Sequence, residues 1–240
     1  MPTYRKDFEK DTRWRSAETE HYVFHFFPDS VAAKDIDAIK TRQESAYQKI
    51  ITFLGVPVPK RKISYYFYPN EVTKTALMGD PWYAQSIYDE FRVHVLYTET
   101  VKPIGEHEDA HLLSLPWGLS IGLFQEGLAE HFSCRNWEGR DHDECVREGY
   151  KRGVLPSVTE LMDHISWSAS ADEHAIYFYS LAGAFTKFLI KKFGKEKFRE
   201  LYQNTNREKS AKENAVVFAG VYGAEVEEVE TPWRRETNNT

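Results

Sequence analysis

The first hundred residues combine short runs of aromatic and β-branched side chains with one long helical pattern. Residues 21–27 and 62–68 are rich in such side chains and each run stops at a proline, which predicts two strands. Between them, apolar residues recur at helical spacing over positions 31–54, which predicts a long amphipathic helix. Residues 85–88 and 91–98 then predict a β-hairpin.

Beyond residue 100 the pattern becomes almost entirely helical. Helices are predicted over residues 104–115, 120–134, 158–165, 172–193, 196–203 and 211–221. A polar loop is expected at 139–144, and the tail from Thr231 is expected to fray unless Trp233 anchors it. The predicted fold class is therefore α+β. A mixed α/β subdomain with a small sheet and an edge strand spans 1–102, a mostly helical subdomain spans 103–240, and the two form one domain overall.

One motif in the helical region carries chemistry, the HExxH sequence that runs from His107 to His111. Residues four apart on a helix share a face, with Cβ atoms about 6 Å apart, so two imidazoles can reach one zinc ion through bonds of about 2.0–2.1 Å. Glu108 lies about 100° further round the helix, where its carboxylate can reach a zinc-bound water rather than the zinc. The motif predicts His107 and His111 as ligands and Glu108 as general base.

A second acidic pattern follows on the next predicted helix. Glu126 and Glu130 stand one turn apart in the sequence EGLAE. A catalytic zinc needs a third protein ligand and an open fourth position. A short Pro-Trp-Gly turn lets the second helix fold back antiparallel on the first, so Glu126 is the candidate third ligand.

HExxH followed by EGLAE resembles the gluzincin metallopeptidases of clan MA, and most closely the compact bacterial peptidase MA-like proteins. The match is sharp over residues 103–132 and loose elsewhere. The resemblance implies that Glu126 completes the site of one Zn²⁺ ion and that Glu130 orients a zinc-bound histidine. It also implies a tyrosine that stabilises the oxyanion, Tyr179 or alternatively Tyr177. The expected fold is zincin-like, with the active-site cleft between the α/β and helical subdomains.

The expected function is that of a zinc metallopeptidase, and more narrowly an endopeptidase. It would hydrolyse peptide bonds through a zinc-bound water activated by Glu108, with a peptide or protein as its substrate. Residues 91–98 are expected to form an edge strand that pairs with the extended substrate. Two alternatives stay open on the same scaffold: a non-catalytic zinc-stabilised binding protein, and a hydrolase that acts on another carbonyl compound. A site of two histidines and one glutamate also accepts other divalent ions.

Three features of the sequence depart from related zinc-peptidase patterns. Asp109 is unusual inside HExxH and is expected to need a partner of its own. The extended metzincin motif is absent, because Ser114 and Trp117 occupy the positions of its glycine and third histidine. The Gly-x-Met-Glu-Asn motif of aminopeptidases is also absent, which argues against a dedicated aminopeptidase.

The composition and charge of the chain exclude several classes of protein. Of the 240 residues, 41% are hydrophobic and 15% aromatic, which excludes a disordered chain. A net charge of −6 gives no basic footprint for nucleic acid, and no apolar run approaches the roughly 20 residues of a membrane span. No signal peptide is visible, so the protein is expected to be either cytoplasmic or secreted with its leader removed. Cys134 and Cys145 are expected to form one local disulfide or to remain two free thiols.

Overall fold

The computed structural model describes residues 4–170 and 174–239 of the chain. It divides into two compact units, Met1–Ser114 and Leu115–Thr240. The first unit contains a five-stranded sheet with helices, and the described part of the second unit is helical. The predicted α+β class is confirmed. The division follows Ser114 rather than residue 102, because the HExxH helix packs on the long helix and on a strand of the first unit.

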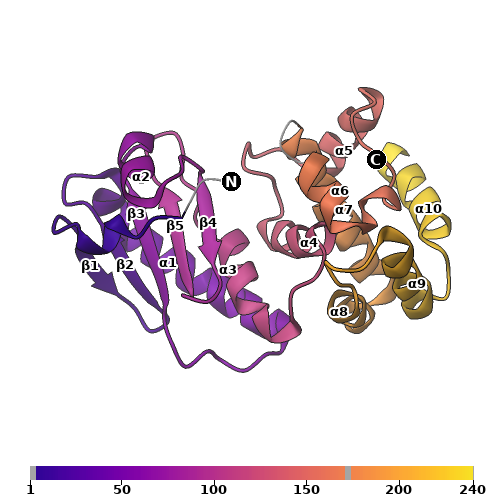
Figure 1. Ribbon diagram of the computed structural model, residues 1–240, viewed down its shortest axis with the longest axis horizontal. Coiled ribbons are helices and arrows are strands. Elements are labelled where there is room, and N and C mark those ends of the chain that lie inside the picture. The colour runs from indigo at the N-terminus through magenta and orange to yellow at the C-terminus, as the bar shows by residue number, and fades with distance from the viewer. Residues whose placement is uncertain (1–3, 171–173, 240) are drawn as a thin grey trace. The chain divides into compact units, whose positions relative to one another are not determined.

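The sheet of the first unit has the order β1-β2-β3-β5-β4 (Figure 1). The strands are β1 (Arg15–Glu18), β2 (Tyr22–Phe26), β3 (Ile63–Tyr68), β4 (Ala84–Ile87) and β5 (Arg92–Leu96). Strands β2, β3 and β5 run parallel, whereas β1 and β4 pair antiparallel at the two edges. The prediction that residues 91–98 form an edge strand is therefore wrong. The hairpin is present, but its second strand pairs with β3 and leaves β4 at the edge.

Helical elements contribute side chains that bury both faces of this sheet. Helix α1 (Val31–Leu54) has the bounds that its apolar pattern predicts. The Ser30 side chain caps its start, Gly55 ends it, and it buries residues such as Ile39 and Ile50. The short turn η1 (Asp7–Lys10) and helix α2 (Glu71–Met78) were not predicted. They contribute Phe8 and Met78 to a hydrophobic cluster with Tyr68 of β3. Tyr66, on the same strand, packs against this cluster.

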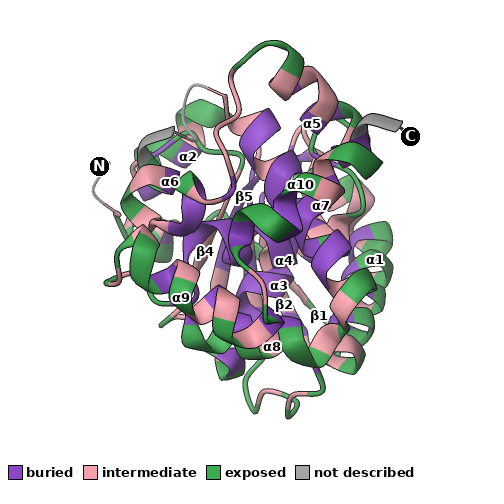
Figure 2. Ribbon diagram, turned by 90° about the vertical axis from the view of Figure 1, so that its right-hand side faces the viewer, coloured by how far each residue is buried: buried purple, intermediate pink, exposed green. Residues whose placement is uncertain are grey.

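Helix α7 is the longest helix of the second unit, and much of it and of α4 is buried (Figure 2). Helix α7 packs on α4 and α5. The elements of this unit are η2 (Leu115–Trp117), α4 (Gly122–Ser133), α5 (His142–Lys151), η3 (Glu160–Met162), α6 (His164–Ser170), α7 (Ala175–Phe193), α8 (Lys195–Asn204), α9 (Ala211–Tyr222) and α10 (Val226–Asn239). The predicted helices at 120–134, 196–203 and 211–221 are confirmed as α4, α8 and α9.

Three predictions about this unit need correction. The polar loop expected at 139–144 contains the start of α5, because the side chain of Asp141 caps that helix by accepting from the Glu144 amide. The helix expected over 158–165 is instead the turn η3 followed by α6. The start of the helix expected over 172–193 lies outside the described residues, but its remainder is α7.

The C-terminal tail is helical: α10 continues without a break past Thr231 to Asn239. Trp233 is buried, and its ring centroid lies 4.9 Å from that of Phe185. The expected fraying from Thr231 is therefore wrong, and the expected anchoring by Trp233 is confirmed.

Two further properties bear on earlier expectations. Cys134 and Cys145 are free, the first exposed and the second buried, so the disulfide alternative is not the one observed. Across positions 4–170 and 174–239, every helix falls short of the length or the apolar character needed to cross a membrane.

Candidate metal centre

Helix α3 (Glu106–Leu113) carries the HExxH motif and starts two residues later than predicted. His107 and His111 lie one turn apart on it, with ring centroids separated by 5.0 Å and ring planes nearly perpendicular at 85°. His111 is buried and His107 is half-buried. The motif therefore presents two imidazoles from one face of a helix.

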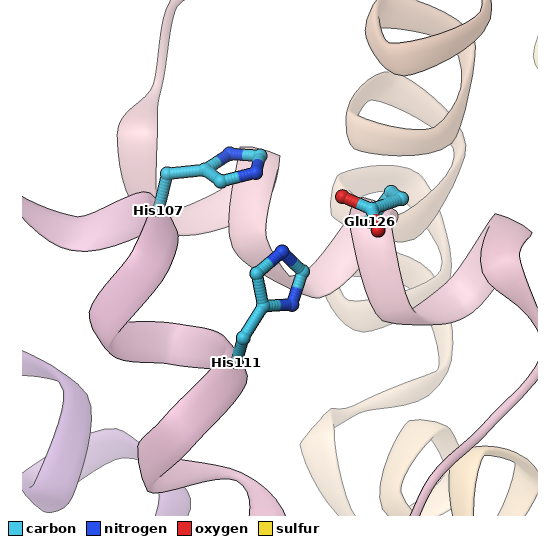
Figure 3. Close-up of side chains that lie close together, drawn as sticks. All are labelled: His107, His111 and Glu126. Atoms are coloured by element: carbon cyan, nitrogen blue, oxygen red, sulfur yellow. The ribbon is translucent and has the colours of Figure 1, made fainter. Parts of the chain in front are cut away.

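Glu126 on α4 completes a group of three potential ligands. His107, His111 and Glu126 each offer one ligand atom, and these atoms all lie within 4.8 Å of one another. Figure 3 shows the two imidazoles and the carboxylate turned toward one another. Imidazole nitrogen and carboxylate oxygen are ordinary zinc ligands, and ligand atoms around a tetrahedral zinc stand about 3.3 Å apart. The donor set therefore fits such an ion.

Asp109, inside the motif, is fully buried and fixes α3 to its own unit. Its carboxylate accepts hydrogen bonds from the Tyr65 hydroxyl at 2.6 Å, the Tyr22 hydroxyl at 2.5 Å and the Gln43 amide at 3.1 Å. Burial raises the pKa of Asp109 to about 8, although the bonds from both tyrosines favour its charged form. The expectation that Asp109 needs partners is confirmed: they come from β2, β3 and α1.

The start of α3 is tied to α1 by a second set of contacts. The Gln43 side chain accepts from the Gly105 amide, at a residue whose φ of +111° favours glycine. Glu106 forms ion pairs with Arg42 at 2.7 Å and Lys49 at 3.1 Å. The histidine pair therefore stands on a helix whose first turn and middle are both anchored.

Glu108 faces the edge strand of the sheet. The Ser86 hydroxyl on β4 lies 2.5 Å from Glu108 Oε2 and 3.2 Å from the Glu108 carbonyl oxygen, and both are acceptors. Ser86 is not among the site residues predicted from the sequence. Strand periodicity alone shows which face of β4 the side chain occupies, and the pairing with Glu108 appears only once the strand order is known.

Helix α4 needs a glycine immediately after Glu126. A Cβ atom at Gly127 would lie 2.2 Å from Thr186 Oγ1 and 2.7 Å from the Ala182 carbonyl oxygen, both on α7. The glycine of EGLAE therefore permits close packing of α4 on α7, which sets where α4 holds Glu126.

Glu130 has a partner that its motif does not predict. Its carboxylate lies 2.7 Å from His142 Nε2, and both side chains are buried. His142 falls in the polar loop predicted at 139–144, whereas it is the first residue of α5. The role of Glu130 in orienting a zinc-bound histidine stays a prediction.

The two candidate oxyanion tyrosines lie in different surroundings on α7. The Tyr177 hydroxyl donates to Glu148 at 3.0 Å. The Tyr179 ring lies against Trp137 and Trp167, with centroid separations of 5.4 and 5.8 Å. The role of Tyr179, or alternatively Tyr177, as the oxyanion donor stays a prediction.

Comparisons with protein families and with curated proteins found no relative of the chain. No family model matches the chain, and a search of curated proteins found no match.

Proposed function

We propose that the protein is a zinc-dependent metallopeptidase of the gluzincin type, with a zincin-like fold and endopeptidase activity. The observation that supports this most strongly is the grouping of His107, His111 and Glu126 within 4.8 Å, on a motif that also supplies Glu108. Three protein ligands with one position left open are typical of catalytic rather than structural zinc.

The chemistry divides between the ion and the side chains around it. When bound, zinc would supply a Lewis acid that polarises water and a substrate carbonyl. Glu108, which is not among the three ligands, accepts the proton of the attacking water and delivers it to the leaving amine. Tyr179 donates a hydrogen bond to the carbonyl oxygen as negative charge develops there.

The strand proposed to pair with an extended peptide is β4 rather than β5. The Leu96 amide donates to the Tyr83 carbonyl at 2.8 Å, which makes these residues a hydrogen-bonded pair of the hairpin. Such pairs alternate along antiparallel strands, so the main-chain groups of Ala84 and Ser86 point away from β5. As β4 is at the sheet edge, they are placed to bind a substrate backbone without demanding a particular sequence.

The decisive variant is Glu108→Gln. It should bind as much zinc as the wild type while losing about 10²–10⁴-fold in peptide hydrolysis, because the amide cannot accept the proton. A peptide library digested with and without chelator measures cleavage, and elemental analysis measures the metal. Glu71→Gln, at an exposed helix position of the same unit, is the control and should leave both unchanged.

Two outcomes would contradict the proposal. Full hydrolysis by Glu108→Gln would remove Glu108 as the base. Zinc binding by a wild type that cleaves no peptide would instead favour a non-catalytic zinc-stabilised binding protein.

A further inference from the structure

The candidate base is held by one side chain on the sheet edge. Ser86 directs its hydroxyl at Glu108 Oε2 over 2.5 Å and lies 3.2 Å from the Glu108 carbonyl oxygen. It therefore contacts both the reactive end and the main chain of the same residue. Both residues belong to the first unit, so its own fold sets this contact.

The sheet register explains why Ser86 points at α3. Ser86 pairs with Val93 on β5, and Val93 pairs with Tyr65 on β3. Paired residues place their side chains on the same face of a sheet. Since Tyr65 donates to Asp109 of α3, this face is the one on which α3 packs. Of these three paired residues, Ser86 is the one on the edge strand β4, and its side chain reaches Glu108.

The main chain of Ser86 points in a different direction from its side chain. Its amide and carbonyl groups point out of the sheet edge, as the hairpin pairing requires. One residue therefore combines a side chain bonded to the candidate base with a main chain placed to bind substrate.

We propose that Ser86 is a positioning residue, which sets the orientation of the Glu108 carboxylate relative to a peptide bound along β4. This inference rests on the proposed peptidase function. The hydroxyl occupies Oε2 of Glu108 and restrains the side chain, which leaves Oε1 to take the proton. Without it, the carboxylate gains rotational freedom, and general-base catalysis is sensitive to displacements of about 1 Å.

Three variants test this role. Ser86→Ala removes the hydroxyl, Ser86→Thr keeps it in a residue suited to a strand, and Ser16→Ala removes a strand hydroxyl that bonds to His25 on β2. We expect Ser86→Ala to lower kcat about 10- to 100-fold with KM nearly unchanged, and Ser86→Thr to restore most of the loss. Zinc content and the unfolding midpoint should match the wild type in all three.

A second measurement does not depend on activity. In metal-free protein labelled with ¹³C at the glutamate carboxyl, the Glu108 resonance is the one missing from Glu108→Gln. Ser86→Ala should shift this resonance, whereas Ser86→Thr and Ser16→Ala should leave it in place, because only the first removes the hydrogen bond to Glu108.

The two measurements separate the possible failures. An unmoved resonance, an unchanged kcat, or loss of zinc in Ser86→Ala would each overturn the positioning role. A shifted resonance in a protein whose wild type cleaves no peptide would confirm the contact but refute its catalytic purpose, and the failure would then lie with the proposed function.

Discussion

The Tyr65 hydroxyl donates a 2.6 Å hydrogen bond to Asp109, the central residue of the HExxH motif. This bond joins the middle of the sheet to the helix that carries both histidines. The two candidate histidine ligands therefore stand on a helix that a buried carboxylate fixes from within its own unit, and no ion is needed to explain why α3 lies where it does in that unit.

The first prediction concerns this anchor. Asp109→Ala should lower the free energy of unfolding by about 2–4 kcal/mol, because it removes the acceptor of the buried Tyr65 hydroxyl and one acceptor each from the Tyr22 hydroxyl and the Gln43 amide. Denaturant titration measures the change. Asp35→Ala removes a carboxylate that is only half-buried and also pairs with a tyrosine and a lysine, and it should have a much smaller effect. Equal effects of the two substitutions would refute the anchoring role.

The second prediction concerns the glycine that follows Glu126. Gly127→Ala should destabilise the protein by about 1–3 kcal/mol, because the added methyl group would meet Thr186 and the Ala182 carbonyl on α7. Gly220→Ala is the matched control on α9, where a Cβ would meet nothing within 4 Å. It should stabilise the protein by about 0.5–1 kcal/mol through helix propensity. If Gly127→Ala were also stabilising, close packing of α4 on α7 would not explain the glycine.

The third prediction concerns pH. Burial lowers the pKa of His94 well below its ordinary value, and the Tyr68 hydroxyl lies 2.9 Å from its Nδ1. Below about pH 6.5 the unfolded chain takes up a proton that the folded chain refuses, so stability is complete above that pH and falls as the solution is acidified.

His94→Gln should flatten this loss relative to the wild type. The difference in slope can reach about 1.4 kcal/mol per pH unit, because one proton is taken up on unfolding. Urea titrations at several pH values between 7.5 and 4.5 provide the comparison. Parallel slopes in the two proteins would show that His94 already takes up its proton in the folded state.

The sequence predicted much of the fold where local pattern decides it. The helix that became α1 was predicted with its bounds, since its N-cap, apolar stripe and terminal glycine all act locally. Strand order is different, because a hairpin has two strands and its pattern does not show which one pairs with a distant third. The edge strand was therefore assigned to residues 91–98 instead of β4. Helix α5 was missed because its polar, charged residues resemble a loop until the Asp141 cap is seen.

The candidate site divides in the same way. His107, His111 and Glu126 were identified from spacing within two neighbouring helices, and the structure brings their ligand atoms together. Ser86 and His142 were missed, because each acts on a motif residue from a separate element of the chain. Spacing along a helix reveals candidate ligands, whereas the partners of the other motif residues, Glu108 and Glu130, depend on the tertiary fold.

The central claim is that His107, His111 and Glu126 hold one zinc ion, and elemental analysis tests it most directly. Wild-type protein equilibrated with zinc and then desalted should retain one ion per chain. Glu126→Gln should retain far less, while Glu138→Gln, at an exposed position of the same unit, should match the wild type. Zinc at full stoichiometry in Glu126→Gln, or none in the wild type, would contradict the account.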